Sequence, residues 1–201
     1  MGIRRASDLD IRNSHGLDQF CSALGERPGM LILDLAGVNQ PTVSFLTNYG
    51  HRLYSDDFLR QLDQAFGTGD TFEDQGNPLL VSQFIDSVLP FSESHFDGAL
   101  VWDTLQFLAP SLLEQVVAKL LTVLRPGASL LAFFHAEERV DMIPAYSYRI
   151  HDHKSVELVD RGRRRPVQLF NNRTLEKLFR DFHSVKFFLT RDHLREVIVK
   201  R

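Results

Sequence analysis

The stretch Met30-Leu31-Ile32-Leu33-Asp34-Leu35-Ala36-Gly37 decides the fold of this 201-residue chain. Its first six residues are apolar except for Asp34, as in a parallel strand that helices cover on both faces of a sheet. Pro28-Gly29 breaks the chain just before it, and Pro41 just after it suits the first turn of a helix. The stretch therefore predicts a central β-strand that is followed by a loop and a helix.

Strand and helix patterns alternate along the rest of the chain. Apolar runs predict strands, and apolar residues spaced three and four apart predict helices. The predicted strands cover 51–54, 79–81 or slightly later, 99–102 and 129–134, and the predicted helices cover 41–46, 58–66, 112–124 and 172–182. Two final runs, 185–189 and 194–199, predict a closing antiparallel hairpin. This order indicates an α/β fold with a doubly wound, mostly parallel sheet, which binds ligands outside the carboxyl ends of its strands.

Two segments lie outside this alternation. Residues 1–28 form an N-terminal segment with a short predicted helix at 16–25, ahead of the main domain at 29–201. Residues 137–170 form an inserted loop and hairpin, because their first half is polar and has no clear period. The turn of that hairpin is predicted at Asp160-Arg161-Gly162.

Composition and charge narrow the class of protein. With 43% hydrophobic and 24% charged residues, the chain has the composition of one globular domain. Its net charge of -3 gives no overall attraction for nucleic acid or for an anionic membrane. No apolar run is long enough to cross a bilayer, and Cys21, the only cysteine, cannot form an intrachain disulfide. We therefore expect a cytoplasmic protein without a membrane partner.

Four pieces of sequence resemble the class I S-adenosylmethionine-dependent methyltransferases in their order and spacing. They are the strand and loop Leu33-Asp34-Leu35-Ala36-Gly37, the segment Leu89-Pro90-Phe91 with Phe96-Asp97, the turn Leu124-Arg125-Pro126-Gly127, and the closing hairpin. The resemblance covers residues 29–201. It implies a Rossmann-like methyltransferase fold with a seven-stranded sheet, S-adenosyl-L-methionine as the cofactor, and methyltransferase activity.

The resemblance assigns the cofactor loop to Asp34, Leu35, Ala36 and Gly37. In the family the backbone of this loop contacts the methionine part of the cofactor, and glycines provide the room. Here the usual glycine positions hold Ala36, Val38 and Gln40, and Gly37 is displaced. The loop is thus altered where the cofactor would bind, and a purely structural turn is the alternative interpretation.

The ends of the next strands supply further cofactor residues. At the end of the second strand the family has an acid that accepts hydrogen bonds from the ribose hydroxyls. Asp56 matches it, or Asp57 if the register slips by one, and the alternative is that both residues cap a helix. At the end of the third strand the resemblance points to Ile85 and Asp86 beside the adenine. Trp102, at the end of the fourth strand, either faces the cofactor or packs in the core.

Asp103 and His135 are the predicted catalytic residues. Both directly follow predicted strands, so the resemblance places them at the methyl-transfer edge of the sheet. His135 could act as a general base toward a hydroxyl acceptor, and an exposed or capping histidine is the alternative. Tyr146 and Tyr148 lie in the segment after the fifth strand, which often lines the acceptor site in this family.

Two other groups of residues carry weaker chemical signals. His151 and His153 flank Asp152, but two-residue spacing without a third ligand predicts no metal site. A basic cluster consists of Arg161, Arg163, Arg164 and Arg165. A phosphate or nucleic acid could bind there, but in an acidic chain a solvated hairpin tip explains the cluster better, so we expect no nucleic-acid partner.

Two functions from different classes follow. The first is an S-adenosylmethionine-dependent methyltransferase that acts on a small-molecule acceptor through an oxygen, nitrogen or carbon atom. The second is a catalytically inactive, methyltransferase-like binding or scaffold protein, which the altered loop favours and which the fold alone does not distinguish from the first. A nucleic-acid methyltransferase is a weaker third hypothesis, which depends on Arg163, Arg164 and Arg165.

Overall fold

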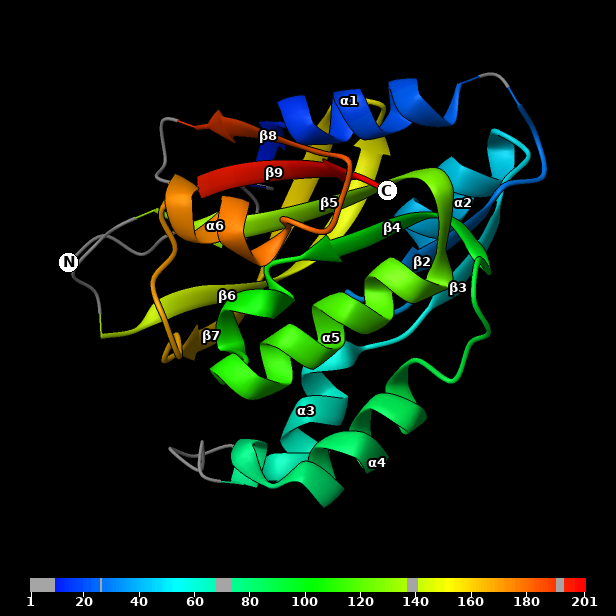
Figure 1. Cartoon of the computed structure of the whole chain (residues 1–201). Helices are drawn as coiled ribbons and strands as arrows, with labels where there is room; N and C mark the ends of the chain where they lie inside the picture. Colours follow the sequence, from blue (N-terminus) through cyan, green and yellow to red (C-terminus); the bar gives the residue numbers. More distant parts are fainter. Residues whose placement is uncertain (1–9, 26, 68–73, 137–140, 191–193) are drawn as a thin grey trace, which may run out of the picture.

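The computed structural model describes residues 10–25, 27–67, 74–136, 141–190 and 194–201. Its main sheet has six strands in the order β3-β2-β4-β5-β9-β8 (Figure 1). These strands are β2 (Leu31–Asp34), β3 (Arg52–Ser55), β4 (Phe96–Trp102), β5 (Leu124–His135), β8 (Ser184–Leu189) and β9 (Leu194–Lys200). The first four in spatial order are parallel, whereas β9 runs antiparallel to both of its neighbours. The predicted central strand and closing antiparallel hairpin are confirmed.

Helices cover both faces of this sheet (Figure 1). One face carries α1 (His15–Leu24) and α2 (Gln40–Asn48), and the other carries α3 (Phe58–Phe66), α4 (Pro78–Val88), α5 (Pro110–Val123) and α6 (Asn172–Leu178). Successive strand residues point to opposite faces, so Ile32 packs with α1 and α2 while Leu33 packs with α3 and α5. Burial on both faces is the reason that the stretch around β2 is apolar throughout.

The segment predicted as a third strand is instead helix α4, so the predicted seven-stranded sheet is wrong by one strand. Asn77 caps this helix by accepting the backbone N–H of Leu79 at 3.0 Å, and Pro78 occupies its first turn. The buried residues of α4 recur with helical spacing at Val81, Phe84, Ile85 and Val88. This helical spacing extends beyond the three apolar residues 79–81 that suggested a strand. The segment forms a helix because a helix buries all four of these residues on one side.

The inserted segment forms a second, antiparallel sheet in the order β1-β7-β6. Its strands are β1 (Ile11–Asn13), β6 (Ile143–Asp152) and β7 (Ser155–Arg164). The hairpin turns at His153-Lys154, so the turn predicted at 160–162 is wrong. Gly162 lies within β7 with φ +94°, at the register shift between the Pro144–Arg163 and Tyr146–Asp160 pairs, and such a bulge continues the strand.

Side-chain hydrogen bonds attach the β6–β7 hairpin to the start of α2. Asn39 Nδ2 donates to the Tyr148 carbonyl at 3.1 Å, and the Ile150 N–H donates to Thr42 Oγ1 at 3.1 Å. The N-terminal segment joins the same sheet, because Ile11 pairs with Glu157 of β7. The predicted helix at 16–25 is confirmed as α1, but residues before it add a strand. Among the described residues, no helix combines the length and the apolar character that crossing a membrane requires.

Candidate functional site

The carboxyl ends of β2 and β3 bring the predicted loop and the predicted ribose acids together. Asp34 pairs with Ser55 in parallel register, and beyond the strands Ala36 forms an isolated bridge with Asp57. The Gly37 N–H donates to the Asp56 carbonyl at 3.0 Å, which holds the loop directly beside the two acids. The sheet register thus produces the arrangement that the sequence predicted for this edge.

Of the two acids, Asp57 has the side chain that lies against the loop. Gly37 has φ +87°, which strains any other residue, and a Cβ added there would make a tight contact 3.2 Å from the Asp57 Cβ. Asp56 turns instead toward Gln61, whose side-chain amide donates to it. Asp57 also caps α3 by accepting the Arg60 N–H at 3.0 Å. Asp57 therefore both caps a helix, as one interpretation predicted, and lies against the loop.

Arg161 of the hairpin forms a two-pronged ion pair with the same Asp57 carboxylate. Its Nη1 and Nη2 donate to Oδ1 and Oδ2 at 3.0 and 2.9 Å. Both side chains are partly exposed, at 29% and 22%. A planar guanidinium is a strong, geometrically matched partner for a carboxylate. The hairpin therefore pairs with Asp57, the acid that the sequence analysis gave as the alternative to Asp56 for the ribose.

Asp34 is fully engaged by its own surroundings at the end of β2. Its carboxylate accepts from Trp102 Nε1 at 2.7 Å, the Ala36 N–H at 3.1 Å and Ser55 Oγ at 3.2 Å. Burial raises the pKa of Asp34 from 3.8 to about 6, and these three hydrogen bonds oppose the rise. Asp34 therefore changes its charge just below neutral pH.

Trp102 is buried in the core at the end of β4. Its indole stacks on the Tyr148 ring with centroids 4.7 Å apart and an angle of 4°, and Phe133 meets it edge-on at 5.5 Å. The residue has φ +56°, a conformation that costs about 1–3 kcal/mol in a non-glycine residue. Of the two interpretations of Trp102, core packing describes its position, and its indole nitrogen adds the contact with Asp34.

The two predicted catalytic residues lie around the same small cavity. Asp103 directly follows β4, His135 ends β5, and both line a cavity of about 30 Å³. Its other lining residues are Arg12, Gln106, Pro144, Tyr146, Tyr148 and Leu194. The two tyrosines predicted to face an acceptor thus contribute to it from β6. The cavity has room for about one or two water molecules.

Asp103 is the acid of this cavity. It is only 2% exposed, and its Oδ2 accepts the Tyr146 N–H at 3.3 Å. Burial raises its pKa from 3.8 to about 7, against the lowering effect of that hydrogen bond. The Tyr148 hydroxyl interacts with Asp103 without reaching regular hydrogen-bond geometry, and burial raises the pKa of Tyr148 well above its usual value. Asp103 can therefore gain or lose a proton near neutral pH.

Gln106 is a member of the cavity that the sequence analysis missed. It lies in η2 (Thr104–Phe107), is 3% exposed, and its Oε1 accepts the His135 N–H at 2.9 Å. The sequence feature that could have pointed to Gln106 is its position as a polar residue within the apolar run that follows β4. Gln106 links the segment after β4 to the end of β5 and so fixes the distance between the two predicted catalytic residues.

Other predicted residues lie away from this edge. Ile85 packs in the core from α4 and Asp86 is exposed, so neither occupies the strand end that the resemblance assigned to it. His151 Nε2 lies 3.3 Å from Glu157, and His153 Nε2 lies 3.9 Å from Asp18. Within the part of the chain that the structure describes, no three His, Cys, Asp or Glu side chains cluster as metal ligands would.

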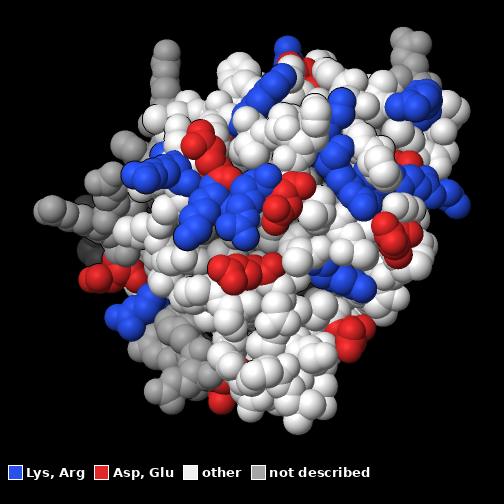
Figure 2. All heavy atoms as spheres, viewed as in Figure 1, with Lys and Arg blue, Asp and Glu red and all other residues white. Residues whose placement is uncertain are grey.

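The predicted basic cluster is solvated, because Arg161, Arg163 and Arg165 are exposed. It lies at the open end of the β6–β7 hairpin and not at its turn, so the predicted position at a hairpin tip is wrong. Besides Arg161 with Asp57, Arg164 pairs with Asp63 and Arg163 Nη2 donates to the Met142 carbonyl at 2.7 Å. Figure 2 shows basic side chains interspersed with acidic ones over the visible face. Arg161 and Arg164 pair with Asp57 at the N-cap of α3 and with Asp63 in α3, a pairing across distant parts of the chain that sequence spacing does not show.

The strand order and the acids at the ends of β2, β3 and β4 define the class of fold: the chain has the Rossmann-like fold of class I S-adenosylmethionine-dependent methyltransferases. A similar structure is that of Burkholderia thailandensis 1,6-didemethyltoxoflavin-N1-methyltransferase with bound 1,6-didemethyltoxoflavin and S-adenosylhomocysteine. It has 16% identity and a TM-score of 0.53, with 92% of this chain and 76% of that chain covered. A Pyrococcus horikoshii OT3 protein has 13% identity and a TM-score of 0.53, with 92% and 87% covered. No family model and no curated protein matches the sequence.

The residues of the loop can be tested against the cofactor that this fold implies. Ala36 is 7% exposed and packs in the core, and Val38 is 75% exposed to solvent. Gln40 begins α2, where its amide donates to Ser44 Oγ at 2.9 Å. None of the three replaced glycines therefore places a side chain between the loop and Asp57. The side chain that occupies the Asp57 carboxylate is that of Arg161.

Proposed function

We propose that this chain is an S-adenosylmethionine-dependent methyltransferase that acts on a small-molecule acceptor. The observation that carries the proposal is the convergence of Asp103 and His135 on one cavity at the carboxyl edge of the sheet. The Burkholderia protein with this fold was crystallised with a small-molecule substrate and S-adenosylhomocysteine, which supports the same chemistry here. A cytoplasmic location, favoured by the single cysteine, is part of the proposal.

The proposed cofactor residues are the loop Asp34, Leu35, Ala36 and Gly37 together with Asp57 and the neighbouring Asp56. Gly37 lets the loop backbone pass close to Asp57, and the Asp57 carboxylate can accept two hydroxyl donors in place of the two Arg161 N–H groups that it now binds. When bound, the cofactor supplies the electrophilic methyl group, and the protein positions the acceptor.

Asp103 and His135 are the residues we propose for proton handling. With a pKa of about 7, Asp103 is present in both charge states at neutral pH, the condition under which a general base or acid works best. The Tyr146 N–H orients its carboxylate, and the Gln106 side chain fixes the backbone at His135. An acceptor hydroxyl would lose its proton to one of these two groups.

Arg161 has a specific role in this proposal. As long as its guanidinium occupies both Asp57 oxygens, a ribose must displace it, so the ion pair opposes cofactor binding. The cavity of about 30 Å³ is also too small for an acceptor. Both obstacles belong to the β6–β7 hairpin, which contributes Arg161, Tyr146 and Tyr148. We therefore propose that the hairpin shifts when ligands bind.

The same contacts favour a second candidate, a methyltransferase-like binding protein that does not use the cofactor. In that case Arg161 with Asp57 and Trp102 with Asp34 are permanent structural contacts that replace ligand contacts. The two candidates differ in one measurable property, which is affinity for the cofactor.

Calorimetry with S-adenosylmethionine and S-adenosylhomocysteine tests the proposal. We expect the wild-type protein to bind both, and Arg161→Gln to bind both about threefold to tenfold more tightly, because a two-pronged ion pair no longer competes. Arg163→Gln is the matched control, since Arg163 contacts the Met142 carbonyl and not Asp57. If neither ligand binds to any of the three proteins at millimolar concentration, the enzyme proposal fails and the second candidate stands.

A further inference from the structure

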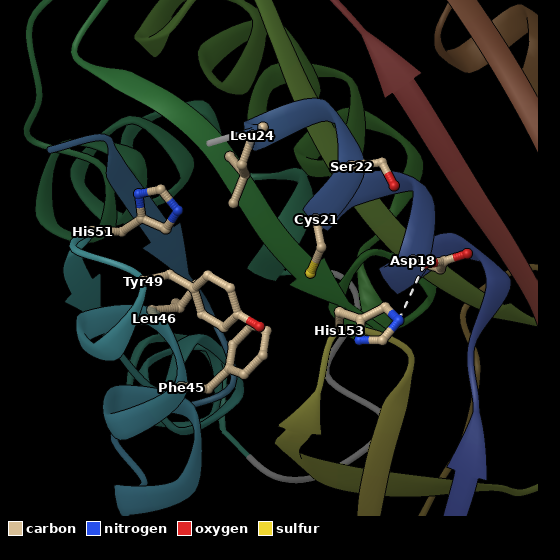
Figure 3. A pocket seen from close by; sticks show the side chains of 10 residues that line it. Asp18, Cys21, Ser22, Leu24, Phe45, Leu46, Tyr49, His51 and His153 are labelled. Carbon is tan, nitrogen blue, oxygen red and sulfur yellow. Dashed lines mark ion pairs between the residues drawn. The ribbon is translucent and has the colours of Figure 1, made fainter. Parts of the chain in front are cut away.

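A second cavity lies between α1 and α2, away from the carboxyl edge of the sheet. It has a volume of about 200 Å³. Its lining residues are Asp18, Cys21, Ser22, Leu24, Gly25, Phe45, Leu46, Tyr49, His51 and His153. Figure 3 shows the side chains of α1 facing those of α2 across this space, with His51 at one end and His153 at the other. None of these residues belongs to the proposed methyl-transfer site.

The body of the cavity is apolar and partly aromatic. Leu24 and Leu46 are buried, and the rings of Phe45 and Tyr49 lie 5.0 Å apart on α2 at an angle of 50°. An apolar protein cavity of about 150 Å³ holds benzene. A cavity of about 200 Å³ therefore suits a molecule with one or two aromatic rings.

His51 is the buried polar side chain among the residues that line the cavity. It is 6% exposed, and its Nδ1 is buried without a hydrogen-bond partner. Figure 3 shows its ring directed into the space between the helices. A buried N–H without a partner costs more than an unused lone pair, so the proton belongs on Nε2, where a ligand can accept it. Burial lowers the pKa of His51, against an opposing effect of Asp97, which keeps the ring neutral.

The remaining polar groups give the interior no charge. Burial raises the pKa of the Cys21 thiol to about 12, so the thiol is neutral at physiological pH. Asp18 and His153 lie 3.9 Å apart with side chains 45% and 54% exposed, which places this pair at the solvent side of the cavity. A charged ligand would lose its hydration without gaining a partner inside. The lining thus selects an uncharged molecule.

We propose that the cavity between α1 and α2 binds an uncharged aromatic molecule of one or two rings that carries one acceptor oxygen, with His51 Nε2–H as the donor to that oxygen. The site does not depend on cofactor binding. This proposal is therefore independent of the methyltransferase proposal, and its test uses no cofactor.

The test compares acetophenone, which carries a carbonyl oxygen, with ethylbenzene, which has a similar shape and no oxygen. Dissociation constants are measured by NMR titration of the wild-type protein and of His51→Phe, which keeps a ring at this position but has no N–H. His183→Phe is the matched control, because His183 is exposed and does not line the cavity. Cys21→Phe, which fills the cavity, reports whether binding occurs there.

We expect His51→Phe to weaken acetophenone binding by about threefold to tenfold and to change ethylbenzene binding by less than about twofold. His183→Phe should change neither, and Cys21→Phe should abolish binding of both. Circular dichroism of each variant shows that it is folded. The proposal is overturned if the wild-type protein binds neither compound, if His51→Phe weakens both equally, or if folded Cys21→Phe still binds them.

Discussion

Replacing Asp103 with asparagine should stabilise the protein above neutral pH. Asparagine has nearly the same shape, and its side-chain oxygen can still accept the Tyr146 N–H, which lies 3.3 Å from Asp103 Oδ2. The substitution thus removes a charge from the end of β4 with little change in packing. It also removes the acid that we propose for proton handling, so any methyl transfer to a hydroxyl should fall at the same time.

The magnitude follows from the raised pKa. Burial moves the pKa of Asp103 from 3.8 to about 7. Because the folded protein has the higher pKa, its stability is fully present below the unfolded value and is lost as the pH rises through about 7. A difference of this size corresponds to about 4 kcal/mol of unfolding free energy. For a domain of this length, that is roughly 10 °C in Tm.

Urea unfolding of both proteins from about pH 4 to about pH 8 measures the effect. The difference in unfolding free energy should be near zero at the acidic end and should grow through neutral pH in favour of Asp103→Asn. Asp34, with a pKa of about 6, also titrates in this range, but it is present in both proteins and cancels in the comparison. Asp181→Asn, at a position 72% exposed, is the control. A stability difference that does not change with pH would refute the reasoning.

Three further predictions concern other parts of the molecule. Trp102 is the only tryptophan, and its indole donates to Asp34, so its fluorescence should change with a midpoint near pH 6 as Asp34 ionises. Asp34→Asn should abolish that change, and the same pH dependence in the variant would contradict the prediction. Cys21, with its pKa raised to about 12, should react with a thiol reagent about 1,000-fold more slowly than a free cysteine at about pH 8, and unfolding in urea should restore the rate. Gly98→Ala should lower the unfolding free energy by about 1–3 kcal/mol, because the new Cβ would lie 2.9 Å from Phe20 Cζ; an unchanged urea midpoint would count against the packing described between β4 and α1.

The candidate site was predictable where it depends on strand ends. Asp34 and His135 end parallel strands and Asp103 directly follows one, and such strand ends converge at one edge of the sheet. The engagement of Asp57 by Arg161 was not predictable, because the two residues are separated by 104 positions and the pair joins the start of α3 to β7. Gln106 was not predicted, because a single polar residue in an apolar run forms no repeating pattern that would assign it to a site.

The stretch around Asp34 by itself determined a central parallel strand with a helix after it, because only a strand buried on both faces is apolar at successive positions. Sequence also determined the closing hairpin and the acids at the sheet edge. Tertiary structure decided that 78–88 is a helix, because burial against α3 and α5 selects the 3.6-residue stripe over a short apolar run. It also decided that the β6–β7 hairpin satisfies Asp57 and covers Trp102, since long-range charge pairing and ring stacking depend on which surfaces meet and not on local propensity.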